Sequence, residues 1–125
     1  MQTSAEFTID LAPGDPVLDG AGRFDFAKTW TGGLSGTSRG VMLTAGDPTT
    51  GTAGYVALET FQGSLDGREG SFAIQQFGTM EDGEQVLHYE IVPGSGHGAL
   101  AGLTGTVDLT ITEGRHDVAV SYVLP

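Results

Sequence analysis

The fold is decided by residues 55–77, which read YVALETFQGSLDGREGSFAIQQF. A period of two indicates two β-strands. It places Tyr55, Ala57, Glu59 and Phe61 on one face of the first, and Phe72, Ile74 and Gln76 on one face of the second. Residues 64–70, between the two runs, contain Asp66-Gly67, a strong hairpin turn signal. The stretch therefore predicts two antiparallel strands joined by a short turn.

The same alternation continues on both sides of this hairpin. It predicts further strands at Phe7, Ile9 and Leu11; at Phe24, Phe26, Lys28 and Trp30; at Val41 and Leu43; at Leu87, Tyr89 and Ile91; at Val107, Leu109 and Ile111; and at Val118, Val120, Tyr122 and Leu124. Turns are predicted at Gly46-Asp47-Pro48 and Glu81-Asp82-Gly83. The 21 glycines are closely spaced, and a helix of average length would contain at least one, at a cost of about 1 kcal/mol each. The sequence thus predicts an all-β protein.

Eight strands with short links fit either a sandwich or a closed barrel. We expect a single domain over residues 1–125, folded as an eight-stranded antiparallel closed β-barrel. Closure removes edge strands, which a chain with a single lysine is poorly equipped to protect. The glycine-rich run at residues 94–105 is unusual, and we interpret it as a bulge or tight corner where two backbones approach. It lacks the following helix that a phosphate-binding loop needs.

The charge balance excludes one large class of partners. The formal net charge is −11, and only five side chains are lysine or arginine, with no basic run. Binding through nucleic acid phosphates or anionic lipid is therefore not expected. Residues 1–11 do not resemble a signal peptide, and no segment has the roughly 20 apolar residues of a membrane span. We expect no membrane partner and a cytoplasmic location.

Motifs for metal or hydrolytic chemistry are missing from the sequence. It has no cysteine, and His88, His97 and His116 lie far apart without the spacing of a zinc site. It has no calcium-binding loop and no Gly-x-Ser-x-Gly nucleophile motif. We therefore expect no metal and no cofactor.

Lys28, the only lysine, is the strongest anomaly. Alternation places it on the buried face with Phe24, Phe26 and Trp30, where an unpaired ammonium would be costly. Glu59 is the best candidate partner, and Gln76 could complete a polar cluster with the pair. The alternatives are a structural ion pair that fixes strand register and a Lys28 side chain that reaches water.

Four blocks of sequence carry a resemblance to a known family. They are residues 28–36, residues 55–63, Gly70-Ser71-Phe72 and residues 92–103. Together they resemble the bacterial family called domain of unknown function 3224, over nearly the whole chain. The resemblance implies an allene oxide cyclase-like barrel, related to dirigent proteins, with an apolar cavity. Lys28 and Glu59 match positions typical of the family, whereas Gln76 stands where a histidine is expected.

Three functions follow as hypotheses. The first is a cofactor-independent cyclase or isomerase that holds a small apolar, natural-product-like substrate while the catalytic pair, Glu59 and Lys28, polarises one of its oxygens. The second is a protein that binds an apolar metabolite without turnover, and the third is a barrel filled by its own side chains. In the first two, the ligand would contact Phe24, Phe26, Trp30, Tyr55, Phe61, Phe72, Gln76, Tyr89 and Tyr122.

The strand that carries Glu59 also has an apolar opposite face. Val56 and Leu58 alternate with Glu59 and are therefore expected to point out of the barrel. Exposed apolar side chains of this kind favour a contact between two copies of the chain, so a homodimer is a further expectation.

Overall fold

The computed structural model describes residues 1–125 as nine β-strands and one short 3-10 helix, η1 (Pro48–Thr50), with no α-helix. The strands are β1 (Gln2–Pro13), β2 (Gly22–Gly32), β3 (Leu34–Asp47), β4 (Thr52–Leu65), β5 (Arg68–Glu81), β6 (Glu84–Ile91), β7 (His97–Gly98), β8 (Thr104–Thr112) and β9 (Arg115–Val123). The structure has no helix with the length and apolar character of a transmembrane span.

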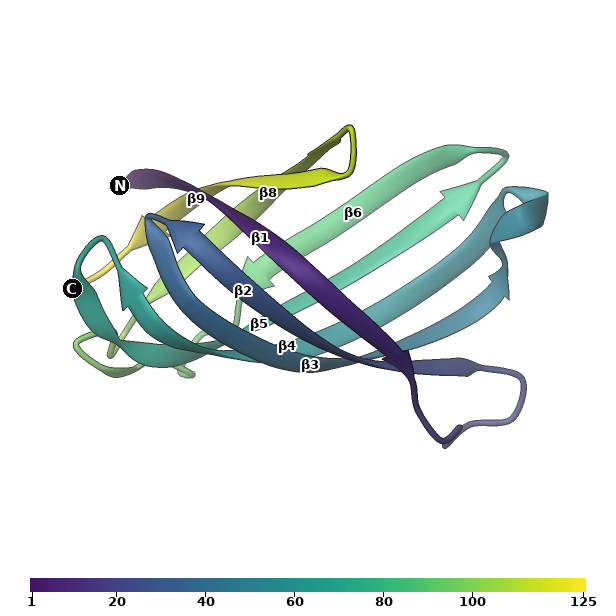
Figure 1. Cartoon of the computed structure of the whole chain (residues 1–125), viewed down its shortest axis with the longest axis horizontal. Coiled ribbons are helices and arrows are strands. Elements are labelled where there is room, and N and C mark those ends of the chain that lie inside the picture. Colours follow the sequence, from purple (N-terminus) through teal and green to yellow (C-terminus); the bar gives the residue numbers. More distant parts are fainter.

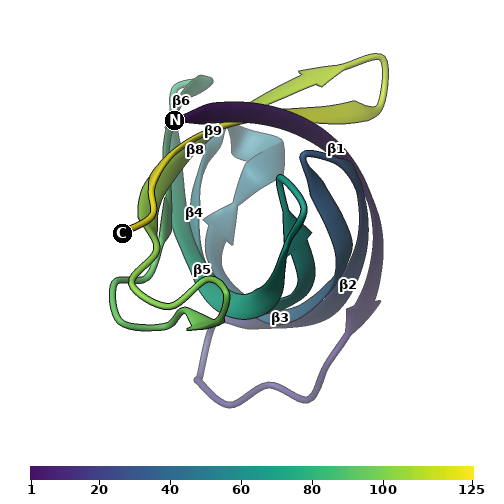
Figure 2. The same cartoon turned by 90° about the vertical axis from the view of Figure 1, so that its left-hand side faces the viewer.

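Eight of these strands form a closed antiparallel barrel (Figure 1). Strands β1 to β6 pair in chain order, β8 follows β6, and β9 returns to pair with β1. Figure 2 shows the strands as a ring, seen from the end that carries both termini. The predicted closed barrel is confirmed, and the sandwich alternative is wrong. The remaining strand, β7, has only two residues and pairs with β5.

The hairpin turns follow the sequence signals. Asp66 and Gly67 join β4 to β5 with φ angles of 48° and 84°, and Asp82 and Gly83 join β5 to β6 with φ angles of 51° and 82°. Two consecutive positive φ angles are the geometry of a two-residue turn whose twist matches the flanking strands. Both turns predicted from an Asp-Gly step are confirmed.

One end of the barrel is filled. Leu34, Leu65, Leu100 and Leu103 are completely or almost completely buried there. Leu100 and Leu103 come from the glycine-rich run, which forms only the two-residue strand β7 beside β5 and lies at the side of the ring in Figure 2. A side chain at Gly70 would collide with the His97 carbonyl oxygen, so the predicted close approach of two backbones is confirmed.

The other end remains exposed to solvent on its inner side. Register places Leu11, Leu87 and Ile111 on the same face as the buried core, yet they are 53%, 40% and 60% exposed. Other inward-facing side chains at this end are only partly buried, namely Ile9, Phe24, Met42, Tyr55 and Leu109. We call these eight residues the exposed inner wall. The inward-facing side chains are therefore buried at one end of the barrel and reached by solvent at the other.

Candidate functional site inside the barrel

A buried ion pair lies between the filled end and the exposed inner wall. Lys28 of β2 and Glu59 of β4 are 3% and 2% exposed, and Lys28 Nζ donates a hydrogen bond of 2.8 Å to Glu59 Oε1. Strand β3 lies between their two strands, so both side chains reach across its inner face. The predicted pair is confirmed, and the alternative in which Lys28 reaches water is wrong.

Three more side chains complete the polar network. Tyr89 receives a hydrogen bond of 3.1 Å from Lys28 Nζ and donates one of 3.2 Å to Glu59 Oε1. Ser38 donates a hydrogen bond of 2.6 Å to Glu59 Oε2, and the Trp30 indole N–H donates one of 2.9 Å to the Ser38 oxygen. Both carboxylate oxygens of Glu59 are therefore occupied by donors from its own chain, which offsets the cost of burying its charge.

Aromatic rings surround the ammonium group. Lys28 Nζ lies 4.3 Å from the centroid of the Phe7 ring and 5.1 to 5.4 Å from those of Phe26, Trp30 and Tyr89. These distances allow attraction between the cation and the ring faces. Burial lowers the pKa of Lys28 below its usual value, although the charge and hydrogen bond of Glu59 oppose that change.

Tyr89 is held strongly in its neutral form. Burial, followed by the nearby negative charge of Glu59, raises the pKa of its hydroxyl well above the usual value. Tyr89 is also the network member from β6, whose preceding inward-facing residue, Leu87, belongs to the exposed inner wall. Its hydroxyl therefore keeps its proton and acts as a hydrogen-bond donor beneath that wall.

Gln76 lies next to this network without joining it. In register it stands between Ala57 of β4 and Tyr89 of β6, on the inner face of β5. Its Oε1 atom is buried and has no hydrogen-bond partner. An unpaired buried acceptor of this kind costs about 1–3 kcal/mol. The network contains Ser38, Tyr89 and Trp30 in the place that the sequence suggested for Gln76.

The predicted ligand-contacting residues divide between the two ends. Trp30, Phe61, Phe72 and Tyr122 belong to the closely packed core cluster. The Trp30 and Phe61 rings meet edge to face with centroids 6.1 Å apart, and the Tyr122 hydroxyl donates a 2.5 Å hydrogen bond to Asp66 in the β4–β5 turn.

The remaining predicted contacts lie at the polar network or above it. Phe24 and Tyr55 belong to the exposed inner wall, Gln76 is partly buried, and Phe26 and Tyr89 are buried between that wall and the ion pair. A ligand entering from the exposed end would therefore meet these five predicted residues before any of the other four.

A comparison with protein-family models places this arrangement in a family. The model described as "Protein of unknown function (DUF3224)" matches residues 3–122. The chain belongs to the DUF3224 family. The resemblance on which the sequence analysis relied is thereby confirmed, and the barrel agrees with the allene oxide cyclase-like description.

A solved structure shares the whole DUF3224 barrel. It is the crystal structure of a protein with unknown function from the DUF3224 family of Shewanella oneidensis MR-1, and the two chains are 40% identical. The alignment covers 100% of this chain and 97% of that chain, with a TM-score of 0.92. Among curated proteins, no match was found.

Sequence reasoning missed Ser38 and part of the inner wall of this DUF3224 barrel. The inner face of β3 carries Gly36, Ser38 and Gly40 next to Met42, while its clear apolar alternation, Val41 and Leu43, points outward. A side chain at Gly40 would collide with the Phe26 ring, so small residues on this face make room for aromatic rings from β2. An inward face composed of small residues gives no hydrophobic signal.

Candidate metal ligands do not converge in the structure. No group of three or more histidine, cysteine, aspartate or glutamate side chains is close enough together to hold a metal ion. The polar network and the adjacent Gln76 offer one ammonium, one carboxylate, one phenol, one alcohol, one indole N–H and one carboxamide.

Proposed function

We propose that this DUF3224 protein binds a small, neutral, largely apolar molecule against the exposed inner wall, above the Lys28–Glu59 network. The observation that carries the proposal is the difference between the two barrel ends. Leu100 and Leu103 are fully buried at one end, whereas Leu11, Leu87 and Ile111 face inward at the other and remain exposed. Covering such apolar surface is favourable by about 25 cal/mol per Å², and inner walls of this composition are typical of ligand sites in small barrels.

The polar groups support a neutral ligand that carries a hydrogen-bond donor. Gln76 Oε1 is a buried acceptor without a partner beside the wall. Lys28, the one cation of the network, already binds Glu59 and Tyr89. The chain has a formal net charge of −11, which repels anions from its surface. A carboxylate or sulfonate ligand is therefore disfavoured.

The test uses two fluorescent probes that share one ring system. N-phenyl-1-naphthylamine is neutral and has an N–H donor, and 8-anilino-1-naphthalenesulfonate adds a negative charge. We expect saturable binding of the neutral probe and at least tenfold weaker binding of the sulfonate. Equal affinities, or no binding of either probe, would contradict the proposal.

Matched variants locate the bound probe. Met42→Trp places a large side chain on the inner wall, whereas Val41→Trp places the same group on the outer surface one residue away. The first substitution is expected to weaken binding of the neutral probe at least tenfold and the second to leave it unchanged. Gln76→Leu is expected to weaken it about tenfold, the equivalent of one hydrogen bond of about 1.4 kcal/mol. If only Val41→Trp weakens binding, the probe is bound outside the barrel and the proposal fails.

A second candidate is the cyclase or isomerase chemistry suggested by the sequence, and the Lys28–Glu59–Tyr89 contacts favour it. In this candidate, the Tyr89 hydroxyl donates a hydrogen bond to a ligand oxygen, and Glu59 removes a proton from the neighbouring carbon. Glu59 must first exchange one of its present donors for the ligand. General acid–base pairs of this kind act through positioned groups within hydrogen-bond reach.

Hydrogen exchange on a bound ketone tests this second candidate. α-Tetralone in D2O exchanges its α-hydrogens by enolisation, and NMR follows the loss of signal. We expect the wild-type protein to accelerate the exchange and Glu59→Gln to abolish the acceleration while the neutral probe still binds. The same exchange rate with and without the protein would exclude the candidate and leave the binding proposal intact.

A further inference from the structure

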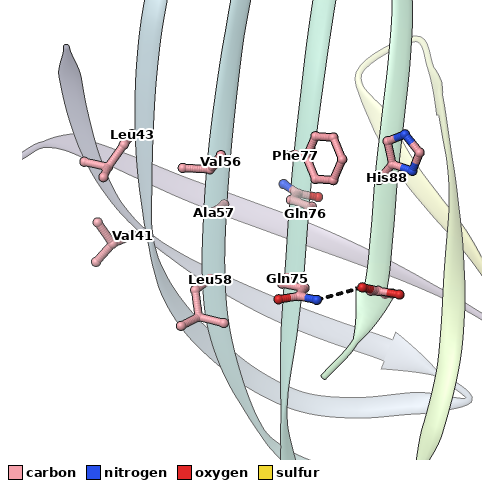
Figure 3. A pocket seen from close by; sticks show the side chains of 10 residues that line it. Val41, Leu43, Val56, Ala57, Leu58, Gln75, Gln76, Phe77 and His88 are labelled. Atoms are coloured by element: carbon pink, nitrogen blue, oxygen red, sulfur yellow. Dashed lines mark hydrogen bonds between the residues drawn. The ribbon is translucent and has the colours of Figure 1, made fainter. Parts of the chain in front are cut away.

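The outside of the barrel carries an apolar surface that the site inside does not use. Val41, Leu43, Val56, Leu58 and Phe77 lie side by side on β3, β4 and β5, and we call them the outer apolar face (Figure 3). Val56, Leu58 and Phe77 are each at least half exposed. With His88, Gln75 and Glu90, these residues line a hollow of about 470 Å³.

Strand register explains why these side chains gather. Leu43 is opposite Val56, which is opposite Phe77, and Val41 is opposite Leu58 on the next outward-facing row. Phe77 also stacks on His88 of β6, with centroids 4.5 Å apart and an interplanar angle of 17°. Single exposed apolar side chains are normal, but a contiguous group of this kind marks an interaction surface.

The charges around the outer apolar face are balanced, unlike those of the whole chain. Between β2 and β6, the outward-facing rows from Leu43 to Arg39 carry two cations, Arg23 and Arg39, and two anions, Asp25 and Glu90. Their formal sum is zero, while the whole chain carries −11. Two copies of so acidic a protein repel each other over most of their surface. Repulsion is reduced where two such neutral faces meet.

One of these charges also lacks a partner within the chain. Arg23 pairs with Asp25 at 3.1 Å, and Gln75 donates a 2.7 Å hydrogen bond to Glu90. Arg39 is exposed and forms no ion pair or side-chain hydrogen bond. A carboxylate of another molecule could form an ion pair with Arg39. In a two-fold contact through this face, Asp25 and Glu90 of the other copy are the carboxylates that can face Arg39.

We propose that the outer apolar face binds a second copy of this chain, as a homodimer with two-fold symmetry. The face spans β2 to β6 and about six residues along each strand, or roughly 20 Å by 20 Å before side chains are counted. This flat area of about 400 Å² is half of the roughly 800 Å² per partner of a standard stable interface, and projecting side chains such as Leu58 and Phe77 add to what a second copy can cover. Two-fold symmetry requires a self-complementary patch, which a neutral apolar face with both charge signs at its rim provides.

Sedimentation velocity of the full chain tests the proposal. The wild type is expected to sediment as a dimer at micromolar concentrations, and Leu58→Glu as a monomer at the same concentrations. Val123→Glu is the matched control, because Val123 is 65% exposed on β9, away from this face. That variant is expected to remain dimeric. Circular dichroism and thermal melting show whether Leu58→Glu keeps the fold.

Arg39→Glu gives an independent measurement that leaves the apolar side chains intact. Reversing this charge is expected to weaken the dimer at least tenfold at low salt, and by less at high salt, because ions screen exposed charges. A wild type that remains monomeric at several hundred micromolar would overturn the proposal. A dimer that survives both Leu58→Glu and Arg39→Glu would also overturn it, since copies would then meet through another surface.

Discussion

Replacing the two charges of the buried pair, singly and together, measures what the pair contributes to folding. Lys28→Met keeps the length of the aliphatic stem among the four rings and removes the ammonium. Glu59→Gln keeps an oxygen for the Tyr89 hydroxyl and removes the negative charge. Each single variant leaves the opposite charge buried, because the two side chains are only 3% and 2% exposed.

The expected size of each effect follows from that burial. Leaving one charge of a buried pair without its partner costs about 3–5 kcal/mol, whereas replacing both by neutral groups is often neutral or stabilising by about 1–4 kcal/mol. In urea, with a slope of about 2 kcal/mol per M, each single variant should lower the unfolding midpoint by roughly 1.5–2.5 M. The double variant should lie close to the wild type.

Urea unfolding, followed by the fluorescence of the buried Trp30 and by circular dichroism, provides the double-mutant cycle. If a single variant fails to fold, recovery of the fold in the double variant is itself the measurement. Single costs below about 1 kcal/mol, or a double cost equal to the sum of the single costs, would refute the reasoning, because independent sites add to within about 0.5 kcal/mol.

Three shorter predictions test other parts of the structure. Burial lowers the pKa of Lys28, so just below the ordinary lysine pKa the unfolded state binds more protons than the folded state. The stability of the wild type should therefore rise with pH there relative to Lys28→Met. Ionisation of the tyrosines should reverse the trend near pH 10. Tyr122→Phe should lower the free energy of unfolding at neutral pH, because the Tyr122 hydrogen bond lowers the pKa of Asp66. Its difference from the wild type should shrink as pH falls through that lowered value, where the wild type loses the same contribution. Leu100→Ala should cost about 2–5 kcal/mol in urea unfolding because its side chain is fully buried, and a cost below 1 kcal/mol would contradict the closed packing of that end.

The buried pair could be predicted from the sequence because side-chain alternation and the presence of a single lysine both pointed to it. Lys28 is the only lysine and alternates with aromatic residues, which predicts that its side chain points inward and needs a partner. Glu59 shared a face with Tyr55 and Phe61 by the same rule. Closure of the barrel was also predictable, since short links and Asp-Gly turns favour pairing between neighbours.

Position along the barrel axis could not be predicted in the same way. Alternation tells which face a side chain occupies and not how far it lies from either end. Leu87 and Ile91 are therefore equivalent in the sequence, whereas one is 40% exposed and the other is buried. The role of Leu100 and Leu103 in closing one end depends on a loop path that glycine composition alone does not specify.

The polar network lies between the core and the exposed inner wall, and the two functional hypotheses assign it different roles. On one side of the pair are Trp30 and Phe61 of the closely packed core, and on the other are Gln76 and the exposed inner wall. A binding protein needs the network only as a rigid, closed floor, so the Lys28→Met and Glu59→Gln double variant should keep its affinity for a neutral probe. An enzyme needs Glu59 to release one of its donors and accept a proton, so the same variant should bind without turnover. A variant made to measure stability therefore also separates binding from catalysis, because it removes both charges while retaining the shape of the floor.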